Sequence, residues 1–222
     1  MSRPIRSLVA YGDCNTLGIN ECKGNAYPEQ LGHALGCPVR NLGHTMSTTR
    51  ELLQYAQAYP ARDYDLIIIQ YGLVDSWLTF RHAPYVLYYP DNPLRRVLRK
   101  LVKKLKKIGR TLHLKTLLGP AHVVPLDEYC SNIERVIALA GDRTVILLST
   151  PPNLDEPRNP HIQTFNQALQ QLAAKHPNAR YVDTYPRIDD AKHEVFYPDG
   201  THLNGAGQRI VTELILQALA AR

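Results

Sequence analysis

Long hydrophobic runs are missing from this 222-residue sequence, and their absence excludes one class of protein. No apolar run approaches the ~20 residues that a membrane-spanning helix needs. The apolar run that follows Arg3 and Arg6 is far too short for a signal peptide, and we interpret it as the first strand of the core. No Pro-, Gly- or Ser-rich linker divides the chain. We therefore expect one domain over residues 1–222, located in the cytoplasm.

Cysteine is also scarce. The chain has four, and no two of them form a CxxC pair. A chain of this size in the cytoplasm does not need disulfides and usually cannot keep them. Cys37 and Cys130 are expected to be inert, whereas a bridge between Cys14 and Cys22 stays open as an alternative. Histidines with the spacing of metal ligands are absent as well, so we expect neither a metal nor another cofactor.

Apolar, β-rich runs alternate with helical patterns along the chain. The runs lie at residues 7–11, 39–42, 65–71, 144–149 and 181–184, and the helical patterns at 27–35, 48–58, 126–140, 161–175 and 205–221. The runs 66–69 and 145–148 are unbroken, as expected of central parallel strands that are covered on both faces. This alternation predicts an α/β fold, a doubly wound, flavodoxin-like parallel sheet of about five strands.

Residues that can carry chemistry stand where these strands end, which is where such sheets place their active sites. Cys14 follows the first strand and Gly43 ends the second. Asp199 and His202 lie in the loop before the last helix. A histidine three residues after an aspartate suits activation of a nucleophile, because the imidazole takes the proton while the carboxylate fixes its tautomer. The backbone N–H groups of Cys14 and Gly43 can then point at a developing oxyanion.

In their order and spacing these segments resemble the SGNH, or GDSL-like, hydrolase family. The family's first block, Gly-Asp-Ser, is matched by residues 12–14, its second-block glycine by Gly43, its third block, Gly-x-Asn-Asp, in part by residues 72–75, and its last block, Asp-x-x-His, by Asp199 and His202. The resemblance implies an SGNH-type fold and an acyl-ester or thioester hydrolase or acyltransferase. It also implies that Cys14, His202 and Asp199 are catalytic and that Cys14 and Gly43 form the oxyanion hole.

Four neighbouring side chains are expected at the substrate: Asp13, Val74, Asp75 and Trp77. For Asp13 and Asp75 the alternative is that they organise their loops. For Trp77 the alternative is that it belongs, with residues 85–89, to a packed connection rather than to a wall of the substrate cleft.

Two residues depart from the family pattern. Cys14 replaces the family's serine, and Val74 replaces the third-block asparagine that donates to the oxyanion. Loss of one such donor typically costs a factor of about 100–1,000 in turnover. Three side chains are candidates to replace it: His44, Gln70 and Asn204.

The cysteine itself bears on the chemistry. We expect His202 to lower the pKa of the Cys14 thiol and to hold it as a thiolate. An acyl group on sulfur is a thioester, which reacts with amines and thiols more readily relative to water than an oxygen ester does, so cysteine favours acyl transfer. The alternatives are an enzyme that has lost its activity and a serine replaced by cysteine in the laboratory.

Acidic residues are absent between Asp91 and Asp127, while ten Lys and Arg fall within residues 94–115. Because the formal net charge of the whole chain is only +6, the rest of the chain is net negative. Apolar residues follow helical spacing from Leu94 to Ile108. This pattern predicts a basic amphipathic helical insertion at about residues 92–116.

The apolar stripe of this helix either packs on the domain or serves an anionic partner, which would be a membrane surface or an acidic carrier protein. A nucleic acid is not expected, because no base-reading motif accompanies the charge. The helix also supports an alternative function, in which a catalytically impaired SGNH-like protein acts as a binding or scaffold module, peripheral to the membrane.

Overall fold

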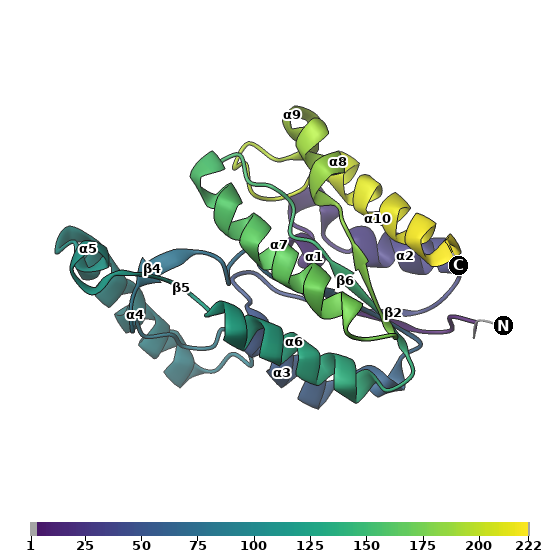
Figure 1. The fold of residues 1–222 in the computed structure, drawn as a ribbon, viewed down its shortest axis with the longest axis horizontal. Helices are drawn as coiled ribbons and strands as arrows, with labels where there is room; N and C mark the ends of the chain where they lie inside the picture. The colour runs from purple at the N-terminus through teal and green to yellow at the C-terminus, as the bar shows by residue number, and fades with distance from the viewer. Residues whose placement is uncertain (1–3, 222) are drawn as a thin grey trace.

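The computed structural model describes residues 4–221 and has a five-stranded parallel sheet at its centre (Figure 1). The strand order is β2-β1-β3-β6-β7, and every neighbouring pair is parallel. The strands are β1 (Leu8–Gly12), β2 (Val39–Gly43), β3 (Leu66–Gln70), β6 (Thr144–Leu148) and β7 (Ala179–Val182). The predicted doubly wound, flavodoxin-like sheet is therefore confirmed.

Helices cover both faces of the sheet (Figure 1). One face carries α3 (Thr49–Ala58), α6 (Leu126–Ala140) and α7 (Asn159–Ala174), and the other carries α2 (Tyr27–Leu35) and α10 (Gly205–Ala220). The central strand β3 is buried throughout, and its side chains alternate between the two layers. Ile67 and Ile69 belong to the cluster under α3, α6 and α7, whereas Leu66 and Ile68 belong to the cluster under α2 and α10.

Short helices occupy the loops between these elements. They are α1 (Cys14–Leu17), α8 (Tyr185–Asp190) and α9 (Lys192–Val195), together with the 3-10 turns η1 (Asn20–Cys22), η2 (Ala61–Asp63) and η3 (Glu156–Arg158). The last strand ends two residues before its predicted end, because the chain already turns into α8 at Asp183. The Asp183 carboxylate accepts a hydrogen bond from Tyr185 N at 3.1 Å.

Between β3 and α6 the chain leaves the sheet and forms a projecting arm, defined here as residues 78–122 (Figure 1). The arm consists of β4 (Leu78–Phe80), α4 (Pro93–Thr111), α5 (Leu114–Leu118) and β5 (Pro120–His122). β4 and β5 pair in antiparallel fashion and close the arm at its base. Over residues 4–221, we find no helix with both the length and the apolar character to cross a membrane.

A buried carboxylate fastens the arm to the domain. Glu51, in the first turn of α3, accepts hydrogen bonds from Thr48 N and Oγ1 at 2.9 and 2.6 Å. It also accepts from Tyr85 Oη at 2.9 Å and from Tyr88 N at 2.7 Å. Tyr89 stacks on Tyr55 of α3 with 4.2 Å between ring centroids. The tyrosine-rich segment is therefore a packed connection.

Glu51→Ala should lower the free energy of unfolding by at least about 2–4 kcal/mol. Each buried donor left without an acceptor costs about 1–3 kcal/mol, and this substitution leaves several. Urea denaturation measures the change, with Glu213→Ala on the exposed side of α10 as the matched control, expected to stay within about 0.5 kcal/mol. A loss below about 1 kcal/mol for Glu51→Ala would show that the connection is not anchored through this carboxylate.

Candidate functional site

The Cys14 thiol lies at the carboxyl end of β1, beside the point where the strand order reverses between β1 and β3. In doubly wound sheets this position is where ligands bind. Cys14 is only 5 % exposed and packs with buried Leu73 and Ile162 and partly buried Tyr185. The nucleophile candidate therefore has an apolar wall on one side.

Asp199 and His202 form a hydrogen-bonded pair. Asp199 Oδ2 lies 2.7 Å from His202 Nδ1, while Asp199 Oδ1 accepts from the backbone N–H groups of Thr201 and His202 at 2.9 and 3.0 Å. Partial burial alone would raise the pKa of Asp199, but these two N–H groups and the imidazole together hold it below its usual value. With Nδ1–H donated to the carboxylate, the lone pair of the neutral ring is on Nε2, which is the arrangement that a general base needs.

Asn15 joins the Cys14 loop to the His202 loop. Its Oδ1 accepts from Leu203 N at 2.9 Å, and its Nδ2 donates to Thr201 O at 3.3 Å. The residue next to Cys14 thus holds the backbone on both sides of His202. The sequence pattern assigns no role to Asn15, whose one signal is a polar side chain directly after Cys14.

The surroundings of Cys14 disfavour its thiolate form. Burial first, and the neighbouring Asp13 carboxylate second, raise the pKa of Cys14 well above its usual value, although the N–H groups of Cys14 and Asn15 oppose the shift. Within residues 4–221 no hydrogen bond joins the thiol to His202. The pKa of this thiol is thus raised where the sequence led us to expect a lowered one, because burial and the Asp13 carboxylate disfavour the thiolate.

The carboxylates of Asp13 and Asp75 organise the loops around Cys14. Asp13 Oδ1 accepts from Asn15 N at 2.9 Å, and Asp75 Oδ1 accepts from Thr49 N and Oγ1 at 2.9 and 2.8 Å. Both side chains are buried, and burial raises the pKa of each to about 7. Their expected role at the substrate stays a prediction.

The backbone of Gly43 lies close to α1. A Cβ atom at this position would be 2.2 Å from Leu17 N, so no larger residue fits. The N–H of Gly43 donates to the carboxamide oxygen of Asn41 at 2.9 Å. An oxyanion can use this donor only after displacing Asn41, and the role of Gly43 in the oxyanion hole stays a prediction.

The three candidates to replace the missing oxyanion donor differ in what their donor atoms contact. The Asn204 amide Nδ2 donates to Glu194 O at 2.7 Å, and its side-chain oxygen caps α10. The Gln70 carboxamide oxygen accepts from Thr16 at 2.9 Å, while its Nε2 is buried without a hydrogen-bond partner. The His44 ring lies tilted against Tyr89, with 4.9 Å between ring centroids. Val74 is buried and has no polar atom in its side chain. Its expected place at the substrate stays a prediction.

Trp77 lies beside the segment that leads into α7. The guanidinium of Arg158 sits 5.3 Å from the Trp77 ring centroid, and the indole Nε1 is buried without a hydrogen-bond partner. Its expected role as a wall of the substrate cleft stays a prediction.

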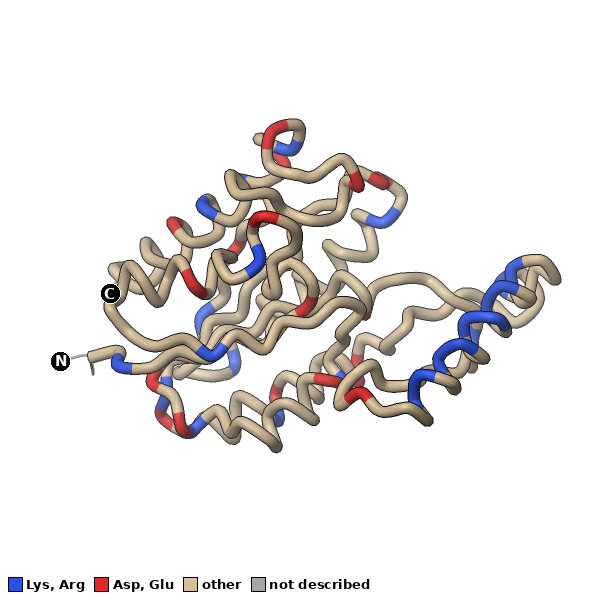
Figure 2. Tube along the Cα trace, turned by 180° about the vertical axis from the view of Figure 1, so that it is seen from behind, with Lys and Arg blue, Asp and Glu red and all other residues tan. Residues whose placement is uncertain are grey.

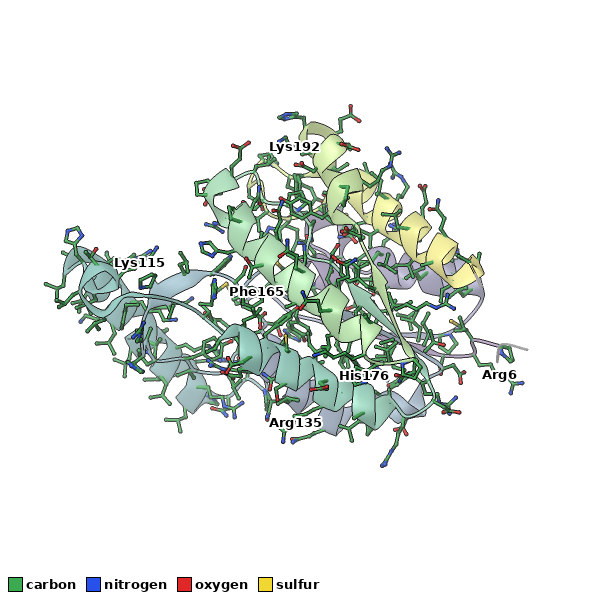
Figure 3. The ribbon with its side chains drawn as sticks, viewed as in Figure 1. Arg6, Lys115, Arg135, Phe165, His176 and Lys192 are labelled. Carbon is green, nitrogen blue, oxygen red and sulfur yellow. The ribbon has the colours of Figure 1, made fainter. Side chains whose placement is uncertain are left out.

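Other reactive side chains do not add a metal or a disulfide to this site. All four cysteines are free thiols, so Cys14 and Cys22 are not bridged. His122 and His161 contact each other at 3.1 Å between ring nitrogens, beside Phe165 of α7, which Figure 3 labels. In the part of the chain that the structure describes, no three His, Cys, Asp or Glu side chains group so as to hold a metal ion.

Solved structures share this fold. A lipase/acylhydrolase from Enterococcus faecalis superposes with a TM-score of 0.68 at 18% identity, covering 97% of this chain and 95% of that one. An acetylxylan esterase from Geobacillus stearothermophilus gives 0.64 at 19% identity, covering 98% and 95%. A lipolytic G-D-S-L family protein from Veillonella parvula gives 0.64 at 13% identity, covering 98% and 100%. These similarities show the fold.

Sequence comparison identifies the family. A search of curated proteins finds no significant match. The model of the GDSL-like lipase/acylhydrolase family, however, matches residues 10–210, which include Cys14, Asp199 and His202. The resemblance noted from the sequence is thereby confirmed, and the chain belongs to the GDSL-like lipase/acylhydrolase family.

Proposed function

We propose that this protein cleaves acyl esters through an acyl group carried on Cys14, with His202 as general base and Asp199 as the group that orients it. Family membership supports ester hydrolysis in general. The proposed roles of His202 and Asp199 rest on the 2.7 Å contact between Asp199 Oδ2 and His202 Nδ1. This contact leaves Nε2 of His202 able to accept a proton. Asn15 supports it by holding the His202 loop against the Cys14 loop.

The protonated thiol implies a particular order of proton movements. Nε2 of His202 removes the thiol proton as Cys14 Sγ bonds to the carbonyl carbon, and the resulting oxyanion faces the N–H groups at the start of α1. The C–O bond of the ester then breaks, and the imidazolium returns its proton to the leaving alcohol. The product on the protein is a thioester. Water, or an amine or thiol acceptor, attacks this thioester, loses its proton to His202 and restores the thiol.

The solved acetylxylan esterase supports this division of roles. Its catalytic mutants replace a serine, an aspartate and a histidine by alanine. In the present chain Cys14, Asp199 and His202 offer a nucleophile, an orienting acid and a base. Since a thioester prefers amine and thiol acceptors over water more strongly than an oxygen ester does, the proposal includes acyl transfer and thioester substrates.

The alternative is a binding or scaffold protein with an impaired site. Val74, which cannot donate a hydrogen bond, favours this alternative. So does α4, whose long exposed surface carries most of the arm's positive charge and which we propose to bind an anionic partner, a membrane or an acidic carrier protein. The two functions are separable, because one depends on Cys14 and the other on the arm.

Intact-mass analysis tests the acyl-cysteine. After incubation with p-nitrophenyl acetate or an acetyl thioester, the wild type should gain one acetyl group, and Cys14→Ala should gain none. His202→Ala should lose the adduct, while Asp199→Asn keeps a remnant, because loss of an orienting acid costs less than loss of the base. Cys37→Ala is the matched control. Unchanged acylation of His202→Ala would refute its role as base, and a wild type that never acylates would favour the scaffold alternative.

Alkylation with iodoacetamide tests the protonation state of Cys14. At near-neutral pH the partly exposed Cys37 and Cys130 should react before Cys14, since burial and Asp13 raise the pKa of Cys14 well above its usual value. The Cys14 rate should keep rising as the pH increases into the alkaline range, and His202→Ala should leave the neutral-pH rate unchanged. Peptide mapping gives the order of labelling. If Cys14 reacts first, it exists as a thiolate paired with His202.

Val74→Asn tests the missing oxyanion donor. If the loop of residues 72–75 faces the reacting carbonyl, ester turnover should rise by up to a factor of about 100–1,000, the amount that one donor supplies. Val74→Leu, which resembles asparagine in shape but has no donor, is the control. Equal turnover of the two folded variants would indicate that the oxyanion is held by other groups.

A further inference from the structure

The apolar stripe of α4 faces solvent. We call it the leucine ridge; it consists of Leu94, Val97, Leu98, Leu101, Leu105 and Ile108 of α4, together with Leu112 directly after the helix. Every member is between 39 and 69 % exposed, and Leu117 of the adjacent α5 is 76 % exposed. Scattered exposed leucines are ordinary on a protein surface, but a contiguous apolar row of this length marks an interaction site.

A different face of α4 packs against the arm. Arg99 donates to Leu87 O and Tyr88 O at 3.1 and 3.2 Å, and its guanidinium lies 5.0 Å from the Tyr88 ring centroid. Lys106 Nζ lies 5.9 Å from the Tyr85 ring centroid. Gly109 is the buried residue of α4, and a Cβ atom there would be 2.8 Å from Phe80. The helix thus packs against the rest of the arm through its polar face, and this packing leaves the leucine ridge exposed to solvent.

Positive charge flanks the leucine ridge on its other side. Lys100, Lys104 and Lys107 are exposed and follow one another at helical spacing; we call them the basic edge. At about 100° per residue, they lie on the side of the ridge opposite to the face that holds Arg99 and Lys106. Figure 2 shows Lys and Arg gathered along α4, at the end of the molecule far from both termini, while acidic residues are spread over the rest. Lys115, labelled in Figure 3, lies at the outer end of the same arm.

We infer that the leucine ridge and the basic edge bind the surface of an anionic lipid bilayer, with α4 lying in the plane of the headgroups. The inference takes from the proposed function only that α4 binds an anionic partner, and it does not depend on Cys14. Aliphatic side chains need no hydrogen-bond partner in the acyl region, and long lysine side chains reach back to anionic headgroups. Two weak signals, apolar and basic, together give stable attachment.

Other occupants fit the described surface less well. A second copy on the ridge would bring two basic edges close together, where like charges repel. An acidic carrier protein complements the charge, but it must also supply an apolar groove as long as α4. A bilayer offers an apolar layer and an anionic layer along its whole surface.

Co-sedimentation with vesicles tests the inference. The wild-type chain should pellet with vesicles of phosphatidylcholine and phosphatidylserine, pellet far less with phosphatidylcholine alone, and be released by salt. Two triple variants remove one signal each: Leu101→Gln/Leu105→Gln/Ile108→Gln and Lys100→Gln/Lys104→Gln/Lys107→Gln. Each should weaken vesicle binding at least about tenfold. The lysine variant loses the attraction of three charges to the anionic surface, and the leucine variant loses the burial of three aliphatic side chains in the acyl region. Lys103 and Lys106 are kept, because they lie over Tyr88 and Tyr85.

Matched controls are available on the exposed surface of the domain. Arg135→Gln/Lys175→Gln/Arg209→Gln removes three charges, and Leu139→Gln removes an exposed leucine; both should bind like the wild type. Turnover of a water-soluble ester is measured on the same preparations and should not change in any variant. If the wild type binds vesicles but does not turn over any ester, the proposed reaction is refuted and the docking surface is not.

Two results would overturn the inference. One is a wild type that does not bind anionic vesicles. The other is a triple variant that binds the vesicles as well as the wild type does. If vesicle binding is absent and the wild type instead forms a concentration-dependent dimer, or binds poly-glutamate, and the leucine variant abolishes this, the ridge is covered by a second copy or by an acidic protein.

Discussion

The covering of the parallel sheet on both faces is the constraint on which the rest of the structure depends. All five residues of β1 and of β3 are buried, so neither strand can present a polar side chain to solvent along its length. Chemistry is therefore confined to the carboxyl edge, where the strands release the chain into loops. Those loops are distant in sequence, and Asn15 bonds to Leu203 across 188 positions. One carboxamide thus holds the Cys14 loop and the His202 loop in a fixed relation at the sheet edge.

A buried carboxyl group, that of Glu51, extends this organisation to the arm. Glu51 bonds to Tyr85 and to Tyr88 N, and the neighbouring Thr49 bonds to Asp75 in the loop after β3. The first turn of α3 consequently holds both the connection to the arm and the loop that contains Val74. The arm and the candidate site therefore share one anchor, although their two surfaces have different chemistry.

Local patterns in the sequence predicted most of the fold, and tertiary burial accounts for most of what they missed. The bounds of α2 and α6 follow from helical periodicity, and the Asp199–His202 pair follows from its three-residue spacing. The three-residue strands β4 and β5 are too short to produce a periodic signal. The pKa of Cys14 depends on which groups surround it, which spacing does not report. Periodicity identified α4 as amphipathic, but only the contacts of Arg99 and Lys106 show which of its faces is seated.

In the proposed reaction, the raised pKa of Cys14 bears on what an oxyanion hole would have to do. A thiolate at this position would lie near the carboxylates of Asp13 and Asp199, which both raise the cost of placing negative charge on sulfur. In the proposed mechanism, attack by a neutral thiol, with its proton passing to His202, would move that charge directly to the carbonyl oxygen. The burial that disfavours the thiolate also lowers the local dielectric, so each N–H that reaches the oxyanion is worth more than it would be in water. A site with fewer donors can then still stabilise the transition state, provided that the N–H groups at the start of α1 face the reacting carbonyl.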